Sequence, residues 1–177
     1  WQALTTTPNE LGESPFWHPH EQQLYWVDIP ARQLQRCNVF TGQVQSWPMP
    51  SEPGCMAPAA KGGLAIALRD GVYRAREWGG ALQKIAAFSH NTATTRFNDG
   101  KCDTLGRFWA GTMFEPRTQA AAELFCLDAR NSGAAPLVTR MAGNATIANG
   151  VAWSPNNDRL YWSDTTSQVI RTWAWEA

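Results

Sequence analysis

Two copies of one pattern, far apart in the chain, decide the fold. The first copy is ESPFWHP at residues 13–19, followed by LYWVD at residues 24–28. The second is NGVAWSP at residues 149–155, followed by LYWSD at residues 160–164. Seven matched positions, among them the tryptophans, the prolines and the closing aspartates, share the same offset of 136 residues. Self-similarity of this kind indicates a repeated structural unit.

Two further copies lie between these. NDGK at residues 98–101 precedes LGRFWAGT at residues 105–112, and a weaker copy runs from Gly54 through a KGG turn into LAIAL at residues 64–68. The units therefore start near residues 13, 54, 98 and 149, in steps of 41, 44 and 51 residues. Steps of roughly 40 to 50 residues are typical of the four-stranded blades of a β-propeller.

The segments inside each unit are short, rich in β-branched and aromatic residues, and separated by turns such as residues 41–42, 69–71 and 156–158. No long stretch has the 3.6-residue apolar period of a helix. The sequence therefore predicts an all-β chain whose hairpins form blades around a channel. Residues 1–177 hold about three and a half to four blades. We expect one propeller domain that is incomplete on its C-terminal side, because an open ring exposes strand edges.

The composition narrows the class of ligand. Lys plus Arg total 15 and Asp plus Glu total 15, which removes the electrostatic argument for nucleic acid or an anionic membrane surface. No run of about 18 apolar residues predicts a membrane span. The four cysteines have neither CxxC spacing nor a zinc-finger histidine pattern, so we expect reduced thiols and a cytoplasmic location. A small neutral ligand fits this chain best.

Three polar residues occupy equivalent positions in different units. Glu13, Asn98 and Asn149 each stand just before the predicted inner strand of a blade. Taken singly, such residues are most often solvated loop or turn residues. Inner strands of a propeller line one channel, however, so these side chains are expected to converge. One carboxylate with two amides suits a hard divalent cation such as Ca²⁺, Mg²⁺ or Mn²⁺.

Four motifs, at residues 11–17, 96–103, 106–113 and 149–155, together resemble the gluconolactonase/regucalcin (senescence marker protein 30) family of metal-dependent sugar lactonases. The resemblance implies a six-bladed propeller that hydrolyses a small sugar lactone with one bound divalent metal, Ca²⁺ first and Zn²⁺, Mn²⁺, Mg²⁺ or Fe²⁺ as alternatives. It also implies the roles of individual residues: Glu13 and Asn149 as metal ligands, Arg96 and Asn98 as substrate-binding residues, and Asp99 beside them at the pocket rim.

Two departures from the family pattern limit this inference. The family's third metal ligand, an Asp also proposed as the catalytic base, falls beyond Ala177, so the catalytic residue is unassigned and the chain alone is expected to be inactive. The remaining blades, as a C-terminal segment or a second chain, are therefore an expected partner. Some members also contact the sugar through a Glu after the Gly-Thr-Met motif. Glu115 is the candidate here, although Pro116 takes the matching place.

Two other functions stay open at this stage: a non-enzymatic propeller that binds a protein or a sugar, and a calcium-dependent phosphotriesterase-like hydrolase. Arg96 also has a structural interpretation, as an ion-pair partner of Asp99 or Asp103. Asp28, Asp103 and Asp164 fall at strand ends, where hydrogen bonding to turns is the commoner role.

Overall fold

The computed structural model describes residues 3–131 and 133–176, which form four antiparallel sheets. The first sheet contains β1 (Gly12–His18), β2 (Gln23–Asp28), β3 (Gln33–Asn38) and β4 (Gln43–Pro48). The second contains β5 (Pro53–Pro58), β6 (Leu64–Leu68), β7 (Gly71–Ala75) and β8 (Gln83–Ala87). The third contains β9 (Thr95–Cys102), β10 (Phe108–Phe114), β11 (Ala122–Asp128) and β12 (Leu137–Ala145). The fourth contains β13 (Ala148–Trp153), β14 (Arg159–Asp164) and β15 (Val169–Ala174).

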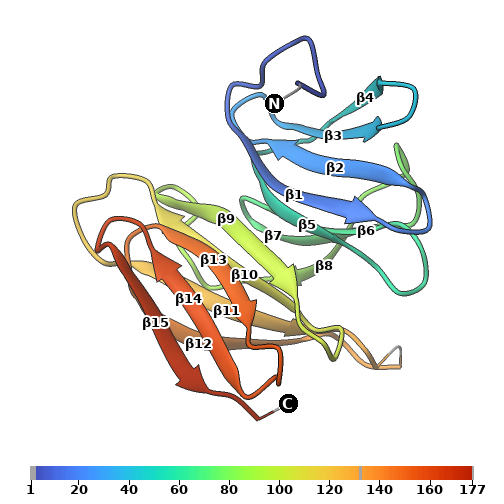
Figure 1. Ribbon diagram of the computed structural model, residues 1–177. Coiled ribbons are helices and arrows are strands. Elements are labelled where there is room, and N and C mark those ends of the chain that lie inside the picture. Colours follow the sequence, from blue (N-terminus) through green and yellow to red (C-terminus); the bar gives the residue numbers. More distant parts are fainter. Residues whose placement is uncertain (1–2, 132, 177) are drawn as a thin grey trace.

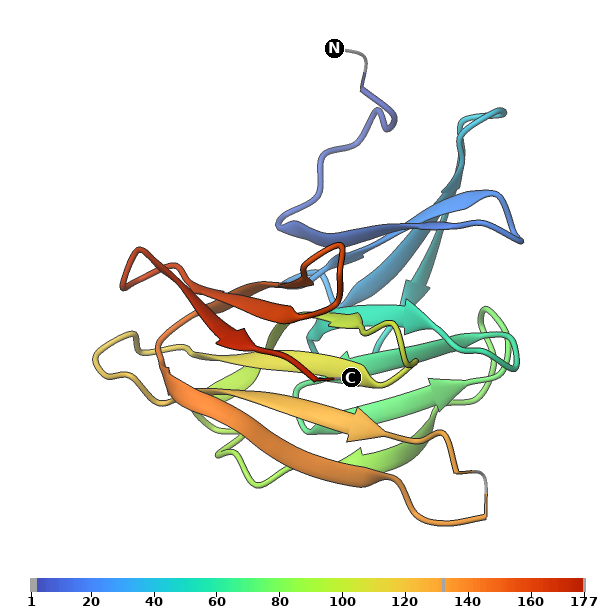
Figure 2. The same ribbon diagram turned by 60° about the horizontal axis from the view of Figure 1, so that its bottom comes forward.

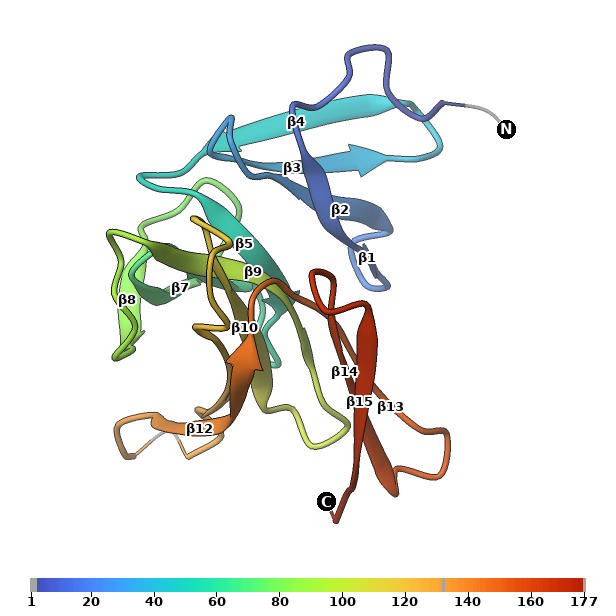
Figure 3. The same ribbon diagram turned by 90° about the vertical axis from the view of Figure 1, so that its left-hand side faces the viewer.

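The sheets follow one another as the blades of a partial propeller (Figures 1 and 3). In each sheet the strands pair in chain order, and the first strand is the inner one. Inner strands of neighbouring blades contact one another, β1 with β5, β5 with β9, and β9 with β13. The all-β fold and the count of about four blades are confirmed. The six-bladed ring that the resemblance implies, and the single incomplete domain, stay predictions.

The sequence repeat is also a repeat of strand register. Gly12 pairs with Asp28 and Ala148 pairs with Asp164, which are the same positions shifted by 136 residues. Both inner strands then carry a β-bulge directly after the candidate ligand. The bulge residues Ser14 (φ 49°) and Gly150 (φ 54°) are in the left-handed region, where L-residues other than Asn and Asp are uncommon. The first and fourth blades therefore present Glu13 and Asn149 on equivalent backbone.

The other two inner strands are bulged at the same level. In β5 the register shifts between Pro53 and Cys55, at Gly54. In β9 the shift lies opposite Ala110–Thr112, at residues 98–99. A bulge breaks the strict alternation of a strand and re-aims a side chain, which is why bulges are common next to binding sites. All four inner strands thus have a β-bulge at the same level, and in β1, β9 and β13 the bulge lies at or next to a candidate residue.

Three apolar cores, one between each pair of neighbouring blades, hold the blades together. Tyr25 and Met56 belong to the first core, Phe97 and Phe125 to the second, and Trp109 to the third. Phe97 packs edge to face on Phe125, and Trp109 on Trp153, as quadrupolar rings prefer. The segment before β1 rises from the first blade, on the side away from the other three (Figure 2). Within the described residues, no helix has the length and apolarity that crossing a membrane requires.

The aspartates at strand ends have the turn role that the sequence predicts. Asp28 accepts hydrogen bonds from the Glu10 and Leu11 amides, at 3.0 and 3.1 Å. Its repeat equivalent Asp164 accepts one from the Ile147 amide at 3.1 Å. In both blades the carboxylate fixes the chain that enters the inner strand. These aspartates orient the segments that carry the candidate ligands without belonging to the site.

β5 packs so closely on β9 that there is no room for a side chain at Gly54. A Cβ added at Gly54 would lie 2.4 Å from the Phe97 carbonyl carbon and 2.7 Å from the Asn98 nitrogen. Because both are backbone atoms, the strands must separate. We expect Gly54→Ala to destabilise the complete protein by about 1–3 kcal/mol, as overpacking does, measured as a lower Tm. Gly133→Ala, whose Cβ meets only Asn131 Oδ1 at 3.5 Å, is the control. Equal Tm values for the two variants would contradict the packing argument.

Candidate functional site

The residues predicted from the sequence come from three blades whose inner strands contact one another. Glu13 lies on β1 of the first blade and Asn149 on β13 of the fourth. The third blade supplies four residues, three on β9 and one directly after β10: Arg96, Asn98, Asp99 and Glu115. Hydrogen bonds and an ion pair link Arg96, Asn98, Asn149 and Glu115. Asp99 is joined to Glu13 and Asn149 through their neighbours Ser14 and Gly150.

The two candidate amides bond directly across blades. Asn98 Nδ2 donates to Asn149 Oδ1 at 2.9 Å and to the Ala148 carbonyl at 2.9 Å. Asn149 Nδ2 donates to Thr165 Oγ1 at 2.7 Å, which fixes the amide with its oxygen toward Asn98. An amide oxygen has two acceptor sites. Asn149 Oδ1 therefore keeps one lone pair for a further partner.

Asp99 ties three inner strands together. Its Oδ1 accepts hydrogen bonds from Ser14 Oγ at 3.1 Å and from its neighbour Gly100 at 2.8 Å. Its Oδ2 accepts one from the Gly150 amide at 2.7 Å. Ser14 and Gly150 are the bulge residues that follow Glu13 and Asn149. One carboxylate thus binds the Ser14 hydroxyl next to Glu13 and the Gly150 amide next to Asn149.

The donor set fits a hard divalent cation. Burial raises the pKa of the Glu13 carboxyl, the charge of Asp99 raises it further, and Arg96 lowers it. The like charges of Glu13 and Asp99 repel each other, and a bound cation would reduce that repulsion. In the described part of the chain, no three His, Cys, Asp or Glu side chains form a metal-binding group by themselves. The roles of Glu13 and Asn149 as metal ligands stay predictions.

Arg96 is the most buried charge of the site, with 7% of its surface exposed. Its Nη1 donates to the Phe97 carbonyl at 2.8 Å and to Asn98 Oδ1 at 3.0 Å. Its Nη2 contacts Met113 Sδ at 3.3 Å, and its Nε lies 3.7 Å from Glu115 Oε1. Burial lowers the pKa of Arg96, and Glu115 opposes that shift.

The ion-pair partner of Arg96 differs from both structural candidates. The structure pairs Arg96 with Glu115, whereas Asp103 binds Arg107 (2.6 Å) and the Trp109 indole (3.0 Å), and Asp99 holds Ser14 and Gly150. The structural interpretation of Arg96 as a partner of Asp99 or Asp103 is wrong.

With this geometry, the chain can be compared with known proteins. A family model described as "SMP-30/Gluconolactonase/LRE-like region" matches residues 11–176. The chain belongs to this family. The membership predicted from the four motifs is confirmed.

Relatives within the family carry lactonase names. A 6-deoxy-6-sulfogluconolactonase of Pseudomonas putida is 38% identical over 169 residues, which are 96% of this chain and 56% of the relative. A pentonolactonase of Haloferax volcanii is 31% identical over 98% of this chain and 56% of its own length. The chain therefore spans little more than half the length of these relatives.

Solved structures support the propeller fold. A calcium-binding regucalcin of Agrobacterium tumefaciens superposes with a TM-score of 0.89 at 24% identity, over 98% of this chain and 57% of the other. A gluconolactonase of Xanthomonas campestris gives a TM-score of 0.75 at 21% identity, over 98% of this chain and 61% of the other. At these identities the likeness shows the fold alone.

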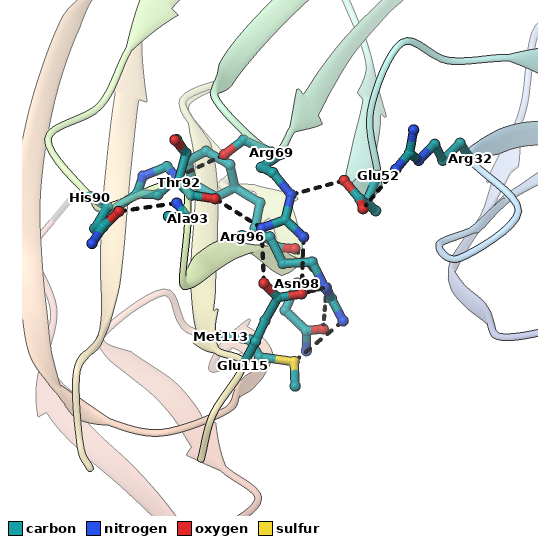
Figure 4. A network of polar contacts seen from close by, with 12 residues as sticks. Arg32, Glu52, Arg69, His90, Thr92, Ala93, Arg96, Asn98, Met113 and Glu115 are labelled. Carbon is teal, nitrogen blue, oxygen red and sulfur yellow. Dashed lines mark hydrogen bonds and ion pairs between the residues drawn. The ribbon is translucent and has the colours of Figure 1, made fainter. Parts of the chain in front are cut away.

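Sequence reasoning missed two charged residues that reach the site of this SMP-30/gluconolactonase-family chain. Arg69, in the turn between β6 and β7, binds Glu115 and Glu52, and Glu52 lies just before β5 (Figure 4). In the sequence, Arg69-Asp70-Gly71 is an ordinary turn. No spacing rule connects Arg69 to a carboxylate 46 residues later. Met113 of β10 is buried against Arg96.

Proposed function

We propose that the complete protein is a divalent-metal-dependent sugar lactonase and that these four blades supply part of its site. One observation carries the proposal: the repeat-equivalent amides Asn98 and Asn149 bond across two blades beside the buried donor Arg96. Asp99 holds Ser14, which is next to Glu13, the equivalent residue of a third blade. A carboxylate, two amides and a guanidinium suit an oxygen-rich substrate at a hard cation. The lactonase names of the relatives support the same reaction.

Glu13 and Asn149 are the residues that would hold the metal, and we propose Ca²⁺, in line with the calcium-binding regucalcin of the same fold. A bound divalent cation polarises a carbonyl and lowers the pKa of water. Asp99 fixes the bulges behind both ligands through Ser14 and Gly150. Asn98 orients the Asn149 amide so that its oxygen is available.

Arg96 and Asn98 would bind and orient the lactone. A guanidinium has five N–H donors. Protein oxygens take both Nη1 donors, and the Met113 sulfur is a weak acceptor for one Nη2 donor. A second Nη2 N–H has no hydrogen-bond partner among the described residues. Lactone hydrolysis develops negative charge on the carbonyl oxygen, and a fixed donor stabilises that charge because it needs no reorganisation.

The parts of the reaction that these residues do not supply are assigned by resemblance. The base would be the family's Asp, expected after Ala177, and the remaining blades would complete the ring as a C-terminal segment or a second chain. The four cysteines are free thiols, three of them buried, which supports the proposed cytoplasmic location.

Turnover measurements on the complete protein test this function. We expect pH-stat detection to show hydrolysis of at least one sugar lactone among glucono-1,5-lactone, a pentonolactone and 6-deoxy-6-sulfogluconolactone. A phosphotriester offered under the same conditions should react far more slowly. Phosphotriester hydrolysis without lactone hydrolysis would favour the phosphotriesterase-like alternative. Turnover of neither class, with sugar binding retained, would favour a binding propeller. Residues 1–177 alone are expected to be inactive.

A further inference from the structure

Arg69 forms the most extensive charged contact near the site, and it reaches Glu115 of the third blade from the second. Its Nη1 lies 2.8 Å from Glu115 Oε2 and its Nη2 lies 2.9 Å from Glu115 Oε1, a two-pronged pair. Its Nε donates to Glu52 Oε2 at 2.9 Å, and Nη1 also donates to the Thr92 carbonyl at 3.0 Å. Figure 4 shows the guanidinium between the two carboxylates.

This geometry holds Glu115 in one place. A forked arginine–carboxylate pair fixes orientation as well as distance, which a single contact to lysine does not. The Arg69 side chain is 22% exposed, so water screens the pair less than on an open surface. Hydrogen bonds from Arg69 hold the pKa of Glu52 at about 2, and those to Glu115 and Glu52 raise the pKa of Arg69. Arg69 and Glu52 therefore stay charged and paired across the physiological range.

Glu115 in turn faces Arg96. The Nε of Arg96 is 3.7 Å from Glu115 Oε1, an ion-pair distance that is too long for a good hydrogen bond. Arg96 is nearly buried and requires a countercharge. If Glu115 moved, the Arg96 guanidinium would lose its ion-pair partner on the Nε side. The direction of its unpartnered Nη2 N–H would then be less strongly fixed. Arg69 donates to both oxygens of Glu115 and so sets the orientation of this carboxylate.

We propose that Arg69, acting through Glu115, is a positioning residue that holds Arg96 in the orientation needed for lactone binding. The inference rests on the proposed function. It assigns to Glu115 the role of a countercharge between two arginines, and the sugar contact predicted from the sequence stays a prediction. It also makes the second blade, which has only Gly54 at the equivalent channel position, a contributor to the site.

The test compares Arg69→Met, Arg69→Lys and Arg96→Ala in the complete protein. We expect Arg69→Met to lower kcat/KM for the best lactone by about ten- to hundredfold, the range typical of residues that orient a binding group. Arg69→Lys keeps the charge without the fork and should recover part of the loss. Metal affinity, measured by calorimetry, should stay within about twofold. Arg130→Met is the matched control, because Arg130 also makes a two-pronged pair, with Asp128, on an exposed surface.

A double-mutant cycle separates positioning from stability. If Arg69 acts through Arg96, adding Arg69→Met to Arg96→Ala lowers kcat/KM no further, even where Tm falls. Full additivity of the two substitutions, or wild-type kinetics in Arg69→Met, would overturn the inference. Should Arg69→Met fail to fold, wild-type kcat/KM in Arg69→Lys would overturn it as well. A wild-type protein that hydrolyses no lactone would instead remove the proposed function, a distinguishable failure.

Discussion

Glu13→Gln in the complete protein is expected to weaken divalent-metal binding by at least about a hundredfold. Loss of outer-shell partners alone costs ten- to hundredfold, and this change removes the charge of a proposed ligand. Lactone turnover should fall with metal affinity. The fold should persist, because Glu13 is an exposed residue of β1 and belongs to none of the three cores. Calorimetric metal titration and the lactone assay measure the two effects, and Tm reports the fold.

Glu10→Gln provides the control for Glu13→Gln. Glu10 carries the same charge three residues earlier, on an exposed position whose amide binds Asp28. Its loss changes the net charge equally and should leave metal affinity unaltered. Equal metal affinity in wild type and Glu13→Gln would show that Glu13 is not a ligand.

The second large effect is expected at Arg96. Removing a donor that acts mainly on the transition state should lower kcat/KM by roughly ten- to thousandfold, with metal affinity little changed in Arg96→Ala. Asn98→Ala should lower kcat/KM in the same range. It should also weaken metal binding modestly, because Asn98 Nδ2 fixes Asn149 Oδ1 at 2.9 Å. Lactone kinetics and metal titration of both variants separate the two effects.

Arg107→Ala serves as the reference for Arg96→Ala, since Arg107 pairs with Asp103 in the same blade and touches none of the candidate residues. It is expected to lower Tm without a comparable loss of kcat/KM. Wild-type rates in both Arg96→Ala and Asn98→Ala would place the substrate site elsewhere.

The blades, and the equivalent positions of the candidate residues on the inner strands, were predictable because both follow from the sequence repeat. The offset of 136 residues fixes which positions share a register, and the pairings of Gly12 and Ala148 follow it. The convergence of Asn98 and Asn149 needs only that fold, because both stand at equivalent inner-strand positions.

Contacts that depend on long side chains from other blades were not predictable. Arg69 reaches Glu115 from a turn, and nothing in the spacing of the two residues marks the pair. The contacts of Asp99 depend on the bulges at Ser14 and Gly150, whose left-handed backbone presents their donors to one carboxylate. A strand pattern with a period of two residues contains no information on such bulges.

Metal removal tests the central claim most directly. The complete protein is treated with a chelator, dialysed until metal analysis finds a small fraction of one equivalent, and assayed on its best lactone by pH-stat. The proposed function predicts that hydrolysis falls to the uncatalysed rate and returns when Ca²⁺, Zn²⁺, Mn²⁺ or Mg²⁺ is added at one equivalent per protein. Undiminished lactone hydrolysis by the metal-free protein would contradict it.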